Sequence, residues 1–233
     1  MLKNAKRFPW VTHPGSSVTP PNDPLNAYAF SSVANIGVDD ESAENLTLTG
    51  TGAVIVANNG NASQWTGSSS FLSRSALLTD SFSACGWIRG STLDTLSNFV
   101  PFKAYQDADH YIEISLYDNT VTDGVHNISC TWQDSGNSNT FNFTVPDDSW
   151  IFWGVVAEMG VGIDVRINNQ TQSQSTANLN ISGNMDLRVN QDSSYGGSET
   201  FYLDELYLWE TDLLTINELG WLYNNGTGRY YPW

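Results

Sequence analysis

The stretch FYLDELYLWETDLLTINELGWLY, residues 201–223, decides the fold because it holds a strand pattern followed by a helix pattern. Apolar residues alternate over residues 201–209, as they do in a half-buried strand. Successive side chains of a strand point to opposite faces, so Leu206 and Leu208 are expected to share one face with Asp204. That position predicts an inward-pointing Asp204. The opposite face is expected to carry Leu203, Glu205, Tyr207 and Trp209.

The second half of the stretch predicts a short amphipathic helix. Thr215 and Glu218 form a T-x-x-E capping box, in which each side chain accepts a hydrogen bond from the backbone N–H of the other. Leu214 before the cap and Leu219 inside the helix can form a hydrophobic staple. The sequence Asn224-Asn225-Gly226 (residues 224–226) supplies residues that tolerate the left-handed conformation and end a helix. The helix is expected to lie with its apolar face on the sheet.

The composition of the remaining chain predicts a single all-β domain. The 233 residues are 12% aromatic, and turn-forming Ser, Asn and Gly separate many short apolar stretches. Residues 110–117 show the alternation clearly, with an apolar face and a polar aromatic face. No run of about 18 apolar residues occurs, so no membrane span is expected. We expect a β-sandwich over residues 25–233, preceded by an extended, proline-rich arm at residues 1–24.

Charge narrows the range of partners. The net charge is −16, with 25 acidic and nine basic residues. A body this acidic repels nucleic acid and anionic membrane, so neither nucleic-acid binding nor membrane insertion is expected. Solubility or a saline habitat explains the charge more simply than cation binding does, because runs of charge are usually solvated faces. No secretory signal is visible, and Cys85 and Cys130 are expected to be reduced, buried thiols.

Several motifs in shared order resemble the laminin-G-like, concanavalin A-like jelly rolls, including pentraxin relatives. The closing motif is Leu203-Asp204-Glu205-Leu206 followed by the capped helix and Gly226-Thr227-Gly228. Upstream, residues 25–30 resemble the family's opening strand, and Phe82 to Arg89 resembles its "FTIsaWvk" strand. The resemblance implies a jelly-roll β-sandwich with one short C-terminal helix, and it covers about residues 25–232.

The same resemblance implies a calcium site at Asp39 and Asp204. In laminin-G-like relatives a metal often lies where an early Asp-rich turn meets the strand that carries the "DE" pair. Calcium binds six to eight hard oxygen ligands, carboxylates among them. The alternative is that Asp204 accepts backbone N–H bonds and that no metal binds. The turn here, residues 41–45, lacks the glycines of the family pattern.

The sequence offers little for catalysis. No metal-ligand spacing, nucleophile elbow or phosphate-binding loop occurs. Concanavalin A-like glucanases carry E-x-D-x-x-E on one strand, whereas here Glu113 lacks the second and third acids. We therefore expect no enzyme, and glycoside hydrolysis is the remaining alternative. Sugar binding on exposed aromatic rings is the function that the resemblance implies. The candidate platforms are Trp65, Trp132, Tyr117, Tyr195 and Tyr207, and for each of them packing in the core or on a sheet is the favoured alternative.

The N-terminal arm predicts a docking segment. It combines three cations with two aromatic residues, which are typical of interface anchors. The candidate docking residues are Lys3, Lys6, Arg7, Phe8 and Trp10. The arm, the acidic body and the absent signal together favour a lectin-like subunit on the surface of a larger particle such as a phage virion. The alternative is a soluble or secreted, calcium-assisted carbohydrate-binding or adhesin domain.

Overall fold

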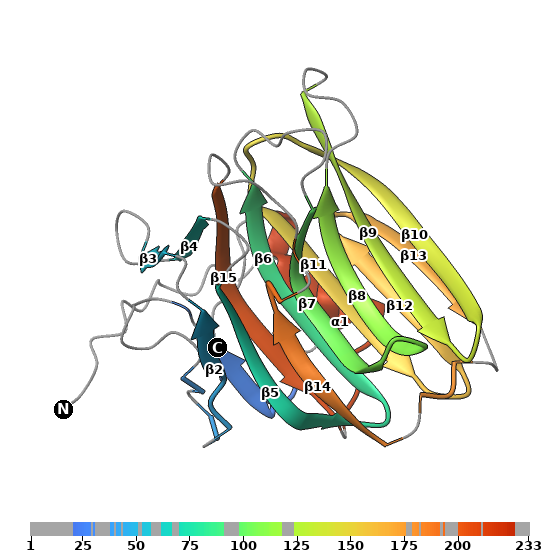
Figure 1. Cartoon of the computed structure of the whole chain (residues 1–233). Coiled ribbons are helices and arrows are strands. Elements are labelled where there is room, and N and C mark those ends of the chain that lie inside the picture. Colours follow the sequence, from blue (N-terminus) through green and yellow to red (C-terminus); the bar gives the residue numbers. More distant parts are fainter. Residues whose placement is uncertain are drawn as a thin grey trace.

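A computed structural model gives the fold of the chain (Figure 1). It describes residues 21–28, 30, 38–39, 41–42, 44–50, 53–56, 62–66, 70–90, 98–117, 124–175, 179–181, 183–191, 193, 200–210 and 212–226. Within these ranges the chain forms two antiparallel sheets and one short α-helix. The all-β sandwich and the short C-terminal helix predicted from the sequence are therefore confirmed.

The first sheet has eight described strands, and one of them, β15, contains the strand part of the stretch that decides the fold. Their order is β13-β12-β11-β6-β15-β4-β3, and β1 pairs with β15. The bounds are β1 Asn26–Tyr28, β3 Ala53–Val56, β4 Ser63–Thr66, β6 Phe82–Gly90, β11 Ile151–Glu158, β12 Gly162–Ile167, β13 Gln170–Ser175 and β15 Thr200–Trp209.

The second sheet has seven described strands in the order β10-β9-β8-β7-β14-β5-β2. It faces the first sheet across the main hydrophobic core. The bounds are β2 Thr47–Gly50, β5 Ser70–Thr79, β7 Asn98–Asp107, β8 His110–Tyr117, β9 Val125–Asp134, β10 Asn137–Pro146 and β14 Asn184–Val189.

The core between the sheets is rich in aromatic rings. Phe99 of β7 and Phe201 of β15 stack with ring centroids 4.3 Å apart, which joins the two sheets directly. Such pairs contribute about 0.5–1.5 kcal/mol beyond the burial of their area. Cys85 and Cys130 are free and buried, as predicted, and burial raises the pKa of both thiols. Both cysteines therefore act as small apolar residues.

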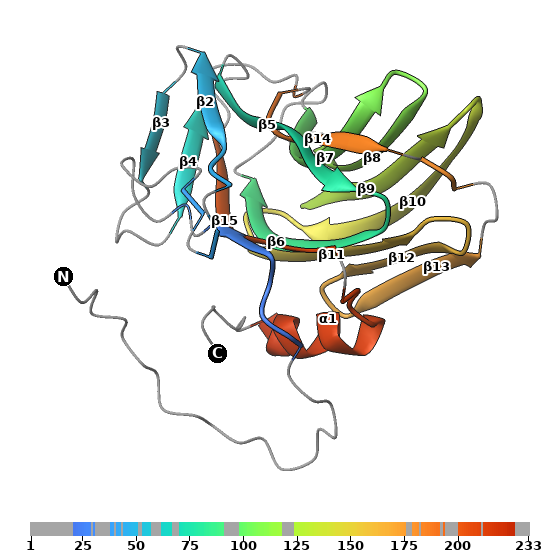
Figure 2. The same ribbon diagram turned by 90° about the horizontal axis from the view of Figure 1, so that it is seen from below.

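Helix α1, Ile216–Tyr223, packs on the outer face of the eight-stranded sheet (Figure 2). Its capping box is present as predicted: Glu218 N donates to Thr215 Oγ1 at 3.2 Å, and Thr215 N donates to Glu218 Oε2 at 2.7 Å. A Cβ at Gly154 would lie 2.7 Å from Leu219, so the helix approaches β11 where a side chain is missing. The helix ends at Asn224, in the left-handed conformation, and continues into the 3-10 turn η2, Asn224–Gly226.

Strand β15 contains a β-bulge that the alternation did not predict. Glu205 has a φ of 54°, and the pairing with β6 shifts register between Asp204 and Leu206. The extra residue places Leu203 on the core face together with Leu206, whereas Asp204 lies opposite Trp87 on the outer face. The predicted faces of Leu203 and Asp204 are therefore wrong, because one inserted residue inverts the alternation beyond it.

Residues 21–24 lie against the sandwich. The indole Nε1 of Trp209 donates to the backbone oxygen of Asn22 at 2.9 Å, and Leu25 N donates to Leu208 O at 2.7 Å. Asn22 also donates from its amide to Asp212 at 3.1 Å. Residues 1–20, with all the predicted docking residues, lie outside the described ranges. The division into an arm and a domain stays a prediction.

The two sheets are joined by side chains along one edge of the sandwich, where β10 and β13 lie side by side (Figures 1 and 2). Gln170 donates to the backbone oxygen of Thr144 at 3.1 Å, and Gln172 donates to that of Asn142 at 3.0 Å. Asn139 completes the series by donating to Gln174 at 2.6 Å. The amides of Gln170 and Gln172 satisfy backbone acceptors of the edge strand β10, which would otherwise be open to another chain.

Candidate functional site

The outer face of the seven-stranded sheet is the main surface that no described element covers. Helix α1 lies against the other sheet, on the side away from β7 to β10 (Figure 2). In β8 the apolar residues Ile112, Ile114 and Leu116 are buried in the core, as the alternation predicts. The side chains between them point outward. We call the outward-facing set the tyrosine face: Lys103, Tyr105, Tyr111, Glu113, Ser115, Tyr117, Asp186 and Arg188.

Strand register orders the tyrosine face into rows that cross the sheet. Arg188 of β14 is opposite Lys103 of β7, and Lys103 is opposite Glu113 of β8. The neighbouring row places Tyr105 opposite Tyr111. Side chains directly opposite one another on adjacent strands have Cβ atoms about 4.5–5.5 Å apart, so each row is a line of touching groups.

Cations and rings alternate on this face. The Arg188 guanidinium lies 3.5 Å from the ring centroid of Tyr105. The Lys103 ammonium lies 4.3 Å from the ring centroid of Tyr111 and 5.4 Å from that of Tyr105. It also pairs with Glu113 Oε2 at 2.9 Å. Cation–π contacts of this kind hold the rings and the charged groups in fixed positions.

Polar groups complete the surface toward β10. Ser115 donates to Glu113 Oε1 at 2.6 Å, and Tyr117 donates to Asn142 Oδ1 at 3.0 Å. The three tyrosines are half-buried, so part of each ring stays accessible. The face therefore offers ring surface beside donors and acceptors that already have fixed orientations, which is how small-molecule sites obtain specificity.

Asp39, a predicted metal ligand, is buried among protein donors. Its carboxylate accepts from Asn26 Nδ2 at 2.6 Å, from Ala27 N and Glu41 N at 3.0 Å each, and from the hydroxyl of Ser42. Burial alone raises the pKa of Asp39, but these hydrogen bonds outweigh burial and hold the pKa below its usual value. The carboxylate ties the turn after β1 to that strand.

Asp204, the second predicted ligand, has different surroundings. Its side chain is 8% exposed, and burial together with the neighbouring Glu205 raises its pKa to about 9. Glu205 in turn accepts a hydrogen bond from the Tyr207 hydroxyl. Asp204 lies opposite Trp87 of β6, whereas Asp39 is bonded to Ala27 of β1. Among the described residues, no group of three or more His, Cys, Asp and Glu side chains forms a metal site.

The calcium prediction has a direct test in thermal stability. A cation at Asp204 requires the ionised carboxylate, so bound calcium is expected to raise the midpoint of melting more strongly as pH rises toward the Asp204 pKa of about 9. Binding to the native state alone at 100 times Kd adds about 2.7 kcal/mol. Melting is to be compared in EDTA and in millimolar Ca²⁺, for the wild type and for Asp204→Asn. An unchanged wild-type midpoint, or an equal rise in Asp204→Asn, contradicts the prediction.

The predicted aromatic platforms are mostly buried. Trp65, Trp132 and Tyr207 are at most 4% exposed, so they are not platforms. Trp65 and Trp132 fill the main core, and Tyr207 lies under α1. Tyr117 is half-exposed on the tyrosine face, and Tyr195 lies outside the described ranges. The sequence did not mark Tyr105 as a candidate, although its contacts with Lys103 and Arg188 place it at the centre of that face.

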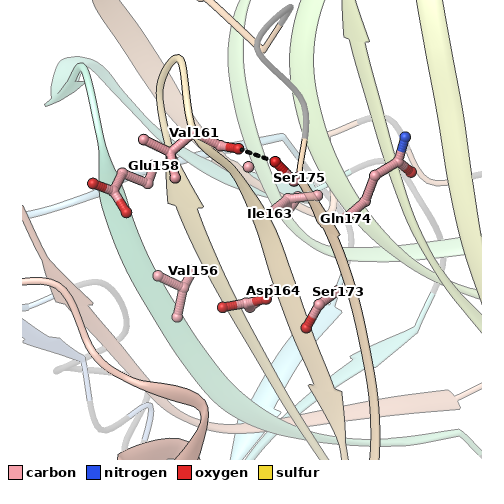
Figure 3. Close-up of a pocket in the computed structure, with 9 residues that line it drawn as sticks. Val156, Glu158, Val161, Ile163, Asp164, Ser173, Gln174 and Ser175 are labelled. Carbon is pink, nitrogen blue, oxygen red and sulfur yellow. Dashed lines mark hydrogen bonds between the residues drawn. The ribbon is translucent and has the colours of Figure 1, made fainter.

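A hollow of about 260 Å³ lies at the edge of the other sheet (Figure 3). Strands β11, β12 and β13 and the turn between the first two line it. In this view Asp164 lies beside Val156, Ser173 lies beyond Asp164 on the next strand, and Glu158 lies above Val156. Its lining residues are Val156, Glu158, Val161, Gly162, Ile163, Asp164, Ser173, Gln174 and Ser175.

Two hairpin turns bring a Ser–His–Asp set together, which the sequence did not predict. His110 Nδ1 is 2.8 Å from Asp107 Oδ1, and His110 Nε2 is 2.9 Å from Ser135 Oγ. Asp134 Oδ1 also lies 3.6 Å from Nε2, so the serine shares that nitrogen with a carboxylate. The set links the β7–β8 turn to the β9–β10 turn. The hydrogen bond between His110 and Asp107 lowers the pKa of the Asp107 carboxyl.

Comparison with known proteins supports the fold. No family model matches the chain, and no curated protein matches it. Among solved structures, the binding domain of botulinum neurotoxin serotype D matches with a TM-score of 0.68 at 14% identity, over 88% of this chain and 51% of that one. A serotype D ligand-binding domain in complex with N-acetylneuraminic acid matches with a TM-score of 0.67 at 15% identity, over 88% and 51%.

A third match is a single domain of similar size. Domain 4 of an extracellular GH43 arabinanase from Geobacillus stearothermophilus, solved with arabinotriose, has a TM-score of 0.62 at 18% identity. The match covers 85% of this chain and 97% of that domain, whereas the chain spans only about half of the neurotoxin domains. The chain thus shares its β-sandwich fold with these domains. No described helix has the length and apolar character needed to cross a membrane.

Proposed function

We propose that the protein is a non-catalytic, laminin-G-like or concanavalin A-like saccharide-binding module, with the tyrosine face as its binding surface. The observation that carries the proposal is the row of Tyr105 and Tyr111 bracketed by Lys103, Glu113 and Arg188 on an uncovered sheet. Sugars present apolar C–H faces and many hydroxyls, so rings beside oriented polar groups fit them. The neurotoxin and arabinanase domains, solved with sugars, support this ligand class.

The face is better suited to binding than to hydrolysis. Glycoside hydrolysis needs two carboxyl groups about 5–5.5 Å apart for retention. Glu113 is flanked across the sheet by Lys103 and Thr131, and its carboxylate is held by Lys103 and Ser115. The Glu113 carboxylate can accept hydrogen bonds from sugar hydroxyls. On the described strands, no second acid lies beside it in its row.

The proposal is tested by screening the protein against immobilised neutral and acidic glycans and assaying the same glycans for released reducing ends. We expect retention on at least one glycan and no release. Turnover that Glu113→Gln abolishes would overturn the non-catalytic function, because it would make Glu113 a catalytic residue. Retention on no glycan would overturn saccharide binding itself.

A second part of the proposal concerns location. We propose that the module lies on the surface of a larger particle such as a virion, or is extracellular, and that residues 1–20 dock it. The cations and aromatic residues of that segment support docking, and the contact of Asn22 with Trp209 holds the residues that follow the segment on the sandwich. Residues 21–233 are to be compared with the full chain for folding and for assembly. Equal assembly of both would refute docking by this segment.

A further inference from the structure

Trp150 is unlike the other tryptophans in the described part of the chain. Its side chain is 38% exposed, whereas most tryptophans of this fold are buried in one of the two hydrophobic clusters. Tryptophan is highly buried on average, so an exposed indole on a rigid strand end is a feature to explain. It immediately precedes β11, on the outer face of the eight-stranded sheet.

The neighbouring strands β6 and β15 place the side chains of Arg89 and Tyr202 near this indole. Tyr202 of β15 is directly opposite Arg89 of β6, and Ile88 of β6 pairs with Ile151, the residue after Trp150. The rings of Trp150 and Tyr202 meet edge to face at 61°, with centroids 6.4 Å apart. The ring contact with Tyr202 therefore joins the indole to β15, and the register places Arg89 of β6 between the two.

An ion pair borders the two rings. Arg89 Nε and Nη2 donate to Asp148 Oδ1 at 3.0 and 2.8 Å, and the guanidinium lies 5.5 Å from the ring centroid of Tyr202. The Asp148 side chain is 63% exposed and that of Arg89 is 35% exposed. We call the four residues Arg89, Asp148, Trp150 and Tyr202 the tryptophan corner.

The corner is separate from both the helix and the tyrosine face. Trp87, the preceding outward residue of β6, stacks on Tyr223 at the end of α1, with ring centroids 6.1 Å apart. Arg89 is the next outward residue along β6, so the corner begins where the helix no longer covers the sheet. The tyrosine face lies on the outer side of the other sheet, across the core.

The chemistry of the corner selects a neutral ligand. Arg89 and Asp148 neutralise each other, so a charged ligand would gain little net attraction and would have to compete with an existing ion pair. Both keep further hydrogen-bonding capacity, since a guanidinium has five N–H donors and a carboxylate about four lone-pair sites. A sugar ring satisfies both features, with its C–H face on the indole and its hydroxyls at the charged pair.

We propose that the tryptophan corner is a second binding site, which takes a neutral saccharide and makes the module bivalent. The ligand class rests on the proposed function, but the site does not depend on the tyrosine face. Two sites on opposite outer faces would let one module bind two chains of a polysaccharide. Binding to a polymer would then exceed binding to a short oligosaccharide through effective concentration.

The test uses the full chain and a panel of neutral oligosaccharides that includes arabinotriose, with N-acetylneuraminic acid as the charged comparison. Affinity is measured for the wild type, Trp150→Ala, Trp150→Phe and Tyr111→Ala, with Leu48→Ala as the control for loss of an exposed apolar side chain. We expect Trp150→Ala to lose about tenfold or more in affinity for at least one neutral member, and Trp150→Phe to retain part of it. N-acetylneuraminic acid is expected to be insensitive to Trp150.

The outcomes separate the two sites. If the affinity for a neutral saccharide falls in Trp150→Ala but not in Tyr111→Ala, the tryptophan corner is supported as a binding site and the tyrosine face is refuted as one. If affinity falls only in Tyr111→Ala, or if Trp150→Ala binds every neutral saccharide as the wild type does, the proposed site at the tryptophan corner is wrong. Unchanged melting midpoints of all variants are required for each comparison, and Trp150→Phe serves where the alanine variant does not fold.

Discussion

The substitution Asp204→Asn is expected to stabilise the protein at pH 8 and to leave its stability near pH 4 almost unchanged. In the folded state burial and Glu205 raise the pKa of Asp204 to about 9, whereas the ordinary value is 3.8. Between these values the unfolded chain releases a proton that the folded chain keeps. Stability then falls with rising pH, by up to about 1.4 kcal/mol for each pH unit. The asparagine amide carries no such proton and removes this slope.

The measurement is the free energy of unfolding from urea titrations between pH 4 and pH 9, in EDTA. The difference between Asp204→Asn and the wild type is expected to grow to a few kcal/mol toward pH 8. Asp164→Asn is the matched control, because it removes one charge from the same outer face but from a half-buried position. A variant profile parallel to the wild type over this range would show that Asp204 ionises normally in the folded protein.

Replacement of Asp39 is expected to be the most damaging single change among the described carboxylates. Asp39→Ala removes four hydrogen bonds and leaves the buried backbone N–H of Ala27 without its acceptor, while the Asn26 amide keeps only Ser42 Oγ, at 3.0 Å. Hydrogen bonds to a charged group contribute about 1.5–3 kcal/mol, and unsatisfied buried donors add to the loss. We expect about 3 kcal/mol or more of destabilisation at pH 7.

The pH dependence of this loss has the opposite sign from that of Asp204. Hydrogen bonding lowers the folded pKa of Asp39, so its contribution is complete above the ordinary value of 3.8 and disappears as pH falls below it. The gap between Asp39→Ala and the wild type should therefore narrow below pH 4. Asp23→Ala, at an exposed position, is the control. A loss under about 1 kcal/mol at pH 7 would mean that the turn does not depend on this carboxylate.

Elements with a local physical cause could be predicted from the sequence. The capping box of Thr215 and Glu218 depends on residues three apart, and the alternation of β8 repeats without interruption. The face of Asp204 could not be predicted, because the bulge at Glu205 depends on how β15 pairs with β6, about 115 residues earlier in the chain. A single inserted residue changes every face assignment beyond it.

The residues of the candidate site could not be predicted from the sequence either, because they depend on burial and strand register. Composition indicates that aromatic side chains are plentiful, but burial decides which of them can meet a ligand. Trp65 is fully buried although polar residues flank it in the sequence, whereas Trp150 is exposed although the apolar residues Ile151 and Phe152 follow it directly. The tyrosine face depends on the register that places Arg188 beside Lys103, and these two residues are far apart along the chain.

The proposed saccharide site on the tyrosine face is tested most directly by calorimetric titration of the best-binding glycan into the wild type, Tyr111→Ala and Tyr111→Phe. Thr140→Ala is the matched control, because Thr140 lies on the same outer face but on the edge strand β10. Its hydroxyl lies 3.1 Å from that of Thr131 on the neighbouring strand β9. We predict at least about a tenfold rise in Kd for Tyr111→Ala, a smaller rise for Tyr111→Phe and none for Thr140→Ala. An unchanged Kd in Tyr111→Ala, with its melting midpoint preserved, would contradict the assignment of this face.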